Sequence, residues 1–191
     1  MMDFVSDLME IAGESSFPDK QSIDWVSLEK SMGVVLPEDY KAILSKYRSA
    51  KFGPILLITP RPGIPGASDP LAATIEWREI FEEVNGDEPG GLPRPCRPSG
   101  EPLGDRTSAF QFFPDTPGLL AWGRDDMGGE YSWYVEGPPN TWTVVAHAAK
   151  EEWWDEHPMT MSEYLYGIVT GRLDCDVAPR GFEGEGIFQE M

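Results

Sequence analysis

Residues 118–146 read GLLAWGRDDMGGEYSWYVEGPPNTWTVVA, and this stretch decides the fold. It contains three runs rich in apolar and aromatic residues, Leu119–Trp122, Glu130–Glu136 and Thr141–Ala146. The segments between the runs consist mainly of Gly, Pro, Asn and Asp, which are residues that form turns. Short connections of this kind join neighbouring antiparallel strands. The stretch therefore predicts an antiparallel meander.

Helices are predicted on both sides of the meander. Apolar spacing and capping residues place them at about 4–12, 22–32, 37–47, 71–84 and 160–170. Ser22 is the expected N-cap of the second helix, and Thr160 is that of the last. The helix at 37–47 has the strongest pattern, with a stripe at i, i+3, i+4 and i+7 that consists of Tyr40, Ile43, Leu44 and Tyr47. The expected buried face of the helix at 71–84 consists of Trp77, Ile80, Phe81 and Val84.

The order of elements predicts an α+β fold. Strands are also expected at 55–59 and 108–113, the latter with Phe110 and Phe112 pointing inward. Helices followed by strands and a final helix favour one domain, with helices packed on one face of a mainly antiparallel sheet. The main domain is expected at 22–173, after an N-terminal helix and connection at 1–21 and before an acidic, frayed tail at 174–191. The segment 86–106, rich in Pro and Gly, predicts a surface loop.

The charge of the chain excludes several classes of partner. There are 33 acidic and 15 basic residues, giving a formal net charge of −18. Such a surface repels nucleic-acid phosphates and anionic lipids. The sequence shows neither a signal peptide nor an apolar run long enough to span a membrane, so we expect a cytoplasmic protein with no nucleic-acid or membrane partner. Cys96 and Cys175 are expected to be free thiols.

Motifs for catalysis or cofactor binding are absent from the sequence. None of the common nucleophile, zinc or phosphate signatures occurs. His147 and His157 are the two histidines, and neither lies near a cysteine in the sequence. Metal sites usually show clustered ligand spacing. We therefore expect no enzymatic activity, no cofactor and no metal ion.

The strand at 130–136 offers a first candidate binding surface. Side chains alternate along a strand, so Glu130, Ser132, Tyr134 and Glu136 share one face. That face is expected to be polar and solvent-exposed. It has two interpretations: a solvated sheet surface, or an acidic docking face with Tyr134 as an aromatic anchor.

The segment EEWWDE at 151–156 offers a second candidate surface. Two adjacent tryptophans cannot point to the same side of a regular element, so at least one is expected in the core. A tryptophan among acids is also a hot-spot candidate for a basic partner. Together the two surfaces supply the predicted partner-binding residues: Glu130, Tyr134, Glu136, Glu151, Glu152, Trp153, Asp155 and Glu156.

Several segments, in this order and spacing, resemble the SUKH superfamily. They are LPEDY at 36–40, GLLAWGRDDMGG at 118–129 with the aromatic strand after it, WTVV at 142–145 and MSEYL at 161–165. The resemblance covers about residues 22–173. It implies an α+β domain with helices on an antiparallel sheet and without catalytic activity. Bacterial members commonly act as immunity proteins that neutralise toxin domains, often nucleases, and fungal relatives include a regulator of cell-wall synthesis.

The leading hypothesis is an immunity protein that binds and neutralises a basic toxin domain, such as a nuclease. A nuclease must be basic around its active site to hold phosphates, so an acidic inhibitor gains electrostatic steering and charge pairing. Two alternatives remain at this stage. One is a regulatory scaffold without a toxin partner, and the other is a carbohydrate-binding protein that uses Trp153, Trp154 and Tyr134 as stacking platforms.

Overall fold

The computed structural model of the chain describes residues 3–17, 22–47, 49–60, 69–85, 95–97, 99–101, 103, 109–148, 153–179 and 187–191. Within these residues the helices are α1 (Phe4–Ala12), α2 (Trp25–Met32), α3 (Glu38–Lys46), α4 (Pro70–Asn85) and α5 (Met161–Val169), with a 3-10 turn at Pro139–Thr141. The strands are β1 (Ala50–Phe52), β2 (Ile55–Leu57), β3 (Gly118–Arg124), β4 (Gly129–Val135), β5 (Thr143–Ala148), β6 (Trp153–His157) and β7 (Phe188–Glu190).

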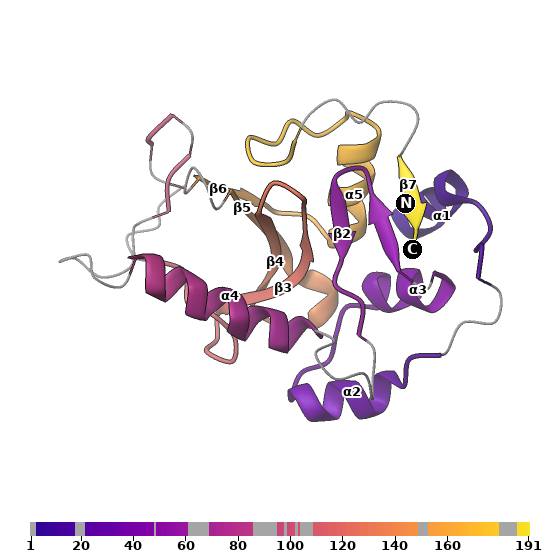
Figure 1. Cartoon of the computed structure of the whole chain (residues 1–191), viewed down its shortest axis with the longest axis horizontal. Coiled ribbons are helices and arrows are strands. Elements are labelled where there is room, and N and C mark those ends of the chain that lie inside the picture. The colour runs from indigo at the N-terminus through magenta and orange to yellow at the C-terminus, as the bar shows by residue number, and fades with distance from the viewer. Residues whose placement is uncertain are drawn as a thin grey trace.

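The strands form one sheet in the order β6-β5-β4-β3-β2-β1-β7 (Figure 1). Every neighbouring pair is antiparallel, which confirms the α+β class and the meander of β3, β4 and β5. The strand predicted at 108–113 does not form within the described residues 109–113, where Phe112 makes a single bridge to Leu119. Phe110 and Phe112 are nevertheless buried, as predicted.

The prediction of a frayed tail is wrong at residues 188–190, which form β7. This strand pairs with β1, with Phe188 opposite Phe52. The ring of Phe188 packs against Tyr47 and Phe52, at centroid distances of 4.7 and 5.0 Å. Leu8 of α1 is also fully buried in the main core. The segments at both ends of the chain therefore contribute to the same core as residues 22–173.

The main core lies on one face of the sheet, beneath α1, α3 and α5. Apolar side chains of β3 and β4, among them Trp122 and Trp133, meet the stripe predicted for α3. The edge of the Tyr40 ring packs on Trp133 at a centroid distance of 5.1 Å. All four residues of that stripe are buried, which confirms the sequence pattern.

The fourth helix, α4, covers the opposite face, so the prediction of helices on one face only is wrong. Trp77 and Phe81 of α4 pack in a second cluster with Leu119, Val145 and Trp154. The reason lies in the strands, which carry apolar residues at consecutive positions and therefore have two apolar faces. A sheet with two such faces must be covered on both sides.

A buried hydroxyl fastens α4 to the sheet. Thr74 is fully buried, and its Oγ1 donates to the carbonyl of Pro70 at 2.6 Å. The same oxygen accepts a hydrogen bond from the backbone N–H of Ala121 in β3 at 2.8 Å. This N–H would otherwise be a buried donor without a partner, which is costly. Thr74 thus fixes where α4 lies on the sheet.

The turn between β3 and β4 is organised by Asp125, which is buried. Its Oδ1 accepts hydrogen bonds from the backbone N–H groups of Met127 and Gly129, both at 2.8 Å. Its Oδ2 accepts one from the Tyr131 hydroxyl at 2.8 Å. A Cβ at Gly129 would lie 2.4 Å from the Asp125 carboxylate, so this position requires glycine. The Asp and Gly residues recognised as turn-forming in the sequence are therefore tied together in one local network.

The N-cap predicted for α5 is confirmed, whereas the N-cap predicted for α2 is wrong. Thr160 caps α5 by accepting from the backbone N–H of Glu163, as predicted. The N-cap of α2 is Asp24, not Ser22. The Asp24 carboxylate accepts from both the backbone N–H and the hydroxyl of Ser27, at 3.1 and 2.7 Å. Two hydrogen bonds to a charged acceptor outweigh what a serine hydroxyl offers.

Candidate functional site

The face of β4 that carries Glu130 and Tyr134 points toward α4 and not into solvent. Ser132, between them, is fully buried, and Tyr134 is half-buried with its ring 5.9 Å from that of Phe110. Glu130 is half-buried, and Glu136, just beyond the strand, is exposed. The prediction of a solvent-exposed sheet face is therefore wrong, because the second aromatic cluster covers it. Binding by Glu130, Tyr134 and Glu136 stays a prediction.

The segment 151–156 is divided between the two sides of β6. Glu151 and Glu152 lie outside the described residues. Trp154 is buried in the second cluster, 5.0 Å from Phe110 between ring centroids, which confirms that one tryptophan belongs to the core. Trp153 and Glu156 are half-buried, and Asp155 is buried. Asp155 is thus not available as an exposed docking charge.

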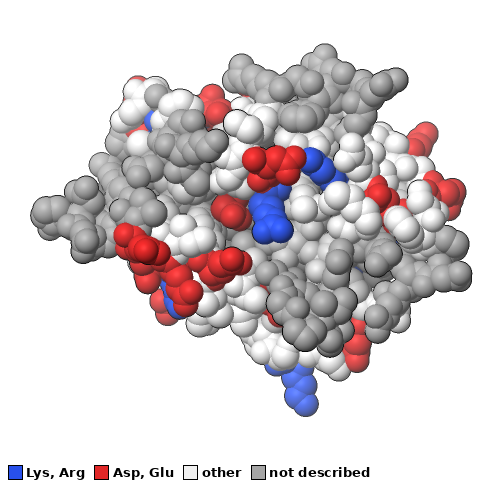
Figure 2. All heavy atoms as spheres, in the orientation of Figure 1, with Lys and Arg blue, Asp and Glu red and all other residues white. Residues whose placement is uncertain are grey.

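The exposed face of α4 brings three acids and one apolar side chain together. Glu76, Glu79, Ile80 and Glu83 occupy positions i, i+3, i+4 and i+7, so they lie on one face of the helix. All four are exposed, and Ile80 is 54% exposed. Figure 2 shows acidic side chains gathered over this helix. We name these four residues the acidic ridge.

Sequence reasoning missed the acidic ridge for a specific reason. It placed Ile80 on the buried face of α4, where Trp77 and Phe81 lie. The buried stripe actually consists of Thr74, Trp77 and Phe81, at i, i+3 and i+7. The one signal for the ridge was the spacing of the glutamates around an isoleucine.

Two titratable side chains lie beneath α4, opposite each other on β4 and β5. Glu130 pairs with His147 in the strand register. Burial raises the pKa of Glu130 to about 7, against the lowering effect of Arg124, and the charges of Asp125 and Glu76 add to the increase. Glu130 therefore lies within the electrostatic reach of the ridge.

His147 is neutral at physiological pH because it is enclosed by aromatic rings. Its ring stacks on Trp154 at a centroid distance of 4.1 Å and meets the edge of Phe81 at 5.6 Å. Burial lowers its pKa to about 4. Neither ring nitrogen has a hydrogen-bond partner among the residues that the structure describes. The imidazole thus packs as an apolar ring would, and its two buried nitrogens without hydrogen bonds reduce the stability of the fold.

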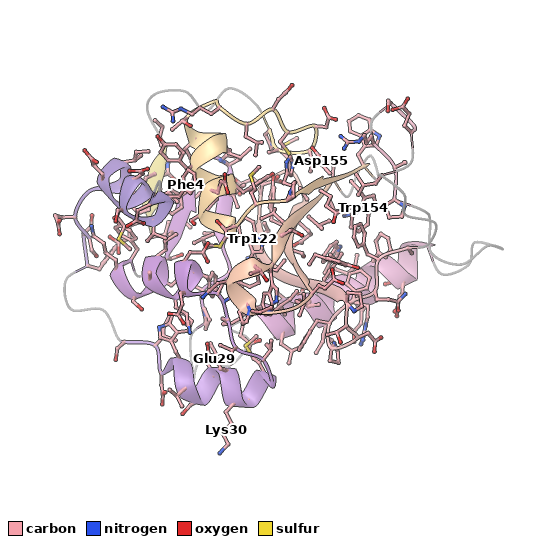
Figure 3. The ribbon with its side chains drawn as sticks, turned by 180° about the vertical axis from the view of Figure 1, so that it is seen from behind. Phe4, Glu29, Lys30, Trp122, Trp154 and Asp155 are labelled. Carbon is pink, nitrogen blue, oxygen red and sulfur yellow. The ribbon has the colours of Figure 1, made fainter. Side chains whose placement is uncertain are left out.

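A polar cluster on the other side of β6 contains Asp155, His157 and Cys175. These residues come from β6 and from the segment after α5, and all three are buried. Figure 3 labels Asp155 where β6 approaches that segment. His157 Nε2 lies 3.1 Å from Asp155 Oδ2. The Tyr164 hydroxyl lies 3.2 Å from Cys175 Sγ. The sequence does not indicate this cluster, since Cys175 is distant from both other residues along the chain.

A hollow of about 170 Å³ lies between the N-termini of α3 and α5, with Trp133 and Trp142 among its lining residues. Its two acidic residues, Glu38 and Asp39, are already engaged, and Glu38 Oε1 lies 2.7 Å from Lys41 Nζ. Asp39 Oδ2 accepts from the backbone N–H of Ser162 at 2.9 Å, and Oδ1 accepts from that of Tyr40 at 2.8 Å. These bonds make Asp39 a cap for both helices, so the hollow offers less to a ligand than the acidic ridge.

Comparisons of the chain with protein families, curated proteins and solved structures found no match. No helix among the described residues is long and apolar enough to cross a membrane. Both cysteines are free, as the sequence predicts. The assignment of a function therefore depends on the geometry and charge of the chain itself.

Proposed function

We propose that this chain is a non-enzymatic protein-binding domain that docks a basic partner protein on the acidic ridge of α4. The observation that carries the proposal is the exposed Ile80 among Glu76, Glu79 and Glu83 on a helix fixed to the sheet. The resemblance to the SUKH superfamily suggests a specific form of this function, in which the partner is a toxin domain and the chain is its immunity protein.

The ridge has the composition of a small interface centre. An apolar side chain surrounded by groups that exclude water contributes most of the binding energy in many interfaces. The surrounding glutamates meet lysine and arginine on the partner and repel other acidic proteins, which gives specificity. The net charge of −18 extends this attraction beyond contact distance and accelerates association at low ionic strength.

Rigid support favours binding by this helix. Thr74, Trp77 and Phe81 hold α4 on the sheet from beneath, so little conformational freedom remains to be lost when a partner docks. Arg78 of α4 is half-buried and lies 4.0 Å from Glu82, which leaves the three ridge glutamates dominant. A basic active site, such as one that holds phosphates, is complementary to this surface.

The experiment uses three tagged baits in a pull-down from the native lysate, with washes of rising salt and mass spectrometry. The first bait is the wild-type chain, and the second carries Glu76→Lys, Glu79→Lys and Glu83→Lys. The third is a matched control with Glu10→Lys, Glu101→Lys and Asp115→Lys, which reverses three exposed acids elsewhere. The two triple variants have the same net charge. A difference in binding between them therefore reports on the acidic ridge and not on the net charge of the chain.

We expect one basic protein, retained at moderate salt in near-stoichiometric amount by the wild-type and control baits and lost from the ridge variant. Equal retention by all three baits would overturn the ridge as the docking face. Retention of no basic protein, or of many partners that leave at low salt, would contradict the inhibitor function and favour the scaffold.

The carbohydrate alternative stays a prediction, and the positions of its three aromatic residues do not favour it. It requires exposed aromatic rings that a sugar could stack on. Trp154 is 2% exposed and Tyr134 is half-buried. Trp153 lies next to Trp154 on β6, and adjacent strand residues point to opposite faces. These three side chains therefore do not form a shared exposed platform.

A further inference from the structure

The cluster beneath the segment after α5 combines three different metal-ligating side chains. Asp155 and His157 are two positions apart on β6, so both point to the same face of the sheet. Cys175 reaches the same point from the segment that follows α5. One ligand atom from each residue lies within 4.8 Å of the other two. The three residues are 4%, 7% and 4% exposed, so the cluster lies below the surface.

We propose that Asp155, His157 and Cys175 bind a divalent transition-metal ion of the zinc class. Carboxylate oxygen, imidazole nitrogen and thiolate sulfur are the three donor types of protein zinc sites. Tetrahedral zinc with ordinary bond lengths separates its ligand atoms by roughly 3.4–3.6 Å. The distance of 3.1 Å between His157 Nε2 and Asp155 Oδ2 is close to this value. A side-chain adjustment of about 1 Å brings in the sulfur.

The imidazole of His157 supplies an independent observation. Its Nε2 is buried, and it has no hydrogen-bond partner among the residues that the structure describes. The Asp155 carboxylate lies 3.1 Å from this nitrogen and forms an ion pair with the ring when the ring is protonated. A buried imidazole nitrogen without an aligned hydrogen bond is uncommon. A metal ion would bind this nitrogen directly, in place of the ion pair.

The surrounding groups support coordination. Cys175 Sγ receives the backbone N–H of Ala178 at 3.4 Å and contacts the Tyr164 hydroxyl at 3.2 Å. Asp155 Oδ2 accepts the backbone N–H of Asp176 at 3.2 Å. Outer-shell hydrogen bonds of this kind orient ligands and stabilise their charge.

The charges around the cluster balance once an ion is bound. One thiolate and one carboxylate neutralise a divalent cation, and the imidazole is neutral. Arg97 Nη1 lies 3.4 Å from Asp155 Oδ1 and 3.9 Å from Asp176 Oδ2, so its charge is met by two carboxylates.

A catalytic triad of cysteine, histidine and aspartate is less compatible with the same geometry. A nucleophilic cysteine must be reached by its substrate, and such cysteines are partially exposed. Cys175 is 4% exposed and packed in the main core. The proposed ion instead joins β6 to the segment after α5, which is a structural role. Three protein ligands leave the fourth position of the ion for water, and it is the burial of the cluster, not the number of ligands, that favours a structural role.

Cobalt reports directly on the proposed ligands, because Co²⁺ bound by a thiolate gives a charge-transfer band in the near ultraviolet. The full chain is treated with EDTA, desalted and titrated with Co²⁺ and then with Zn²⁺. The decisive variant is Cys96→Ser, in which Cys175 is the one remaining thiol. This variant keeps all three proposed ligands. The test therefore remains valid even if a variant that lacks one of the ligands does not fold.

We expect one equivalent of Co²⁺ to give the band in the wild-type and Cys96→Ser chains, and Zn²⁺ to abolish it by displacement. Cys175→Ser should lose the band and bind Zn²⁺ more than about 100-fold more weakly, because the loss of an outer-shell partner alone costs up to that amount. Zn²⁺ at 100 times its Kd should raise the Tm of the Cys96→Ser chain by about 5–10 °C. Absence of the band from Cys96→Ser, or a Tm that Zn²⁺ leaves unchanged, would overturn the site.

Discussion

The contact between Thr74 and Ala121 should dominate the attachment of α4 to the sheet, and Thr74→Val tests this directly. Valine has almost the shape of threonine, so the substitution removes the hydroxyl without creating a cavity. The lost groups are a donor to the Pro70 carbonyl and an acceptor for the Ala121 N–H. The Pro70 carbonyl is at the start of a helix and keeps access to the backbone N–H one turn later. The Ala121 N–H has no such replacement.

The magnitude follows from these two bonds. A hydrogen bond contributes about 0.5–1.5 kcal/mol net, and a buried donor left without a partner costs about 1–3 kcal/mol. The greater apolarity of valine offsets part of this, which leaves a destabilisation of about 2–3 kcal/mol. For a chain of this size the Tm should fall by about 5–10 °C.

Urea unfolding of wild type, Thr74→Val and Thr74→Ser measures the effect. Serine keeps the hydroxyl and loses one methyl group, which costs about 1 kcal/mol. We therefore expect serine to be more stable than valine, the reverse of their hydrophobicity. If valine stays within about 0.5 kcal/mol of wild type, or serine is the less stable of the two, the buried hydrogen bond does not fasten α4.

Three further changes test other parts of the structure. Ile80→Ala should leave the free energy of unfolding within about 0.5 kcal/mol of wild type, because the side chain is exposed, yet weaken partner binding by about tenfold or more in calorimetry. His147 should contribute a loss of up to about 3 kcal/mol of stability as the pH falls from 6.5 to 4, because its pKa is lowered and its neutral form is the one that folding favours. The raised pKa of Glu130 stabilises the fold over an overlapping range and offsets this loss in wild type, so His147→Phe should become more stable than wild type by up to about 3 kcal/mol in acid unfolding curves. Asp125→Ala removes three hydrogen bonds from the turn between β3 and β4 and should cost about 2–4 kcal/mol in urea unfolding, and a loss below about 1 kcal/mol would contradict that network.

Local patterns in the sequence were enough to predict most of the helices and the central meander. The stripe on α3 and the Thr160 cap of α5 depend on residues a few positions apart, and both are present. β1 and β7 have three residues each, too few to show alternation, and they form through pairing in the sheet, β1 with both β2 and β7. The strand β6 was not predicted, because the acidic residues of the segment 151–156 suggested a charged segment exposed to solvent.

The candidate sites, too, could be predicted only where they depend on residues that are close together in the sequence. The face of β4 looked exposed because its polar residues alternate with apolar ones, and only the position of α4 reveals that it is covered. Asp155 and His157 could have been placed on one face had β6 been recognised. Nothing in the sequence could place Cys175 beside them, since that depends on the path of the chain after α5.

The pairing of β7 with β1 has a consequence for how the chain folds as it is synthesised. β1 leaves the ribosome early, whereas its neighbour on the outer side, β7, emerges after every other strand of the described sheet. Until then β1 presents unpaired backbone groups along that edge, and such edges recruit strands from other molecules. Closing so long a loop is slow.

Premature termination would therefore do more than shorten the protein. A nascent chain that stops before residue 187 would leave the rings of Tyr47 and Phe52 without the side chain that covers them. It would also keep the sheet edge open. Such truncated chains should be recognised by chaperones and proteases, so that quality control in the cell depends on whether residues 188–190 are present.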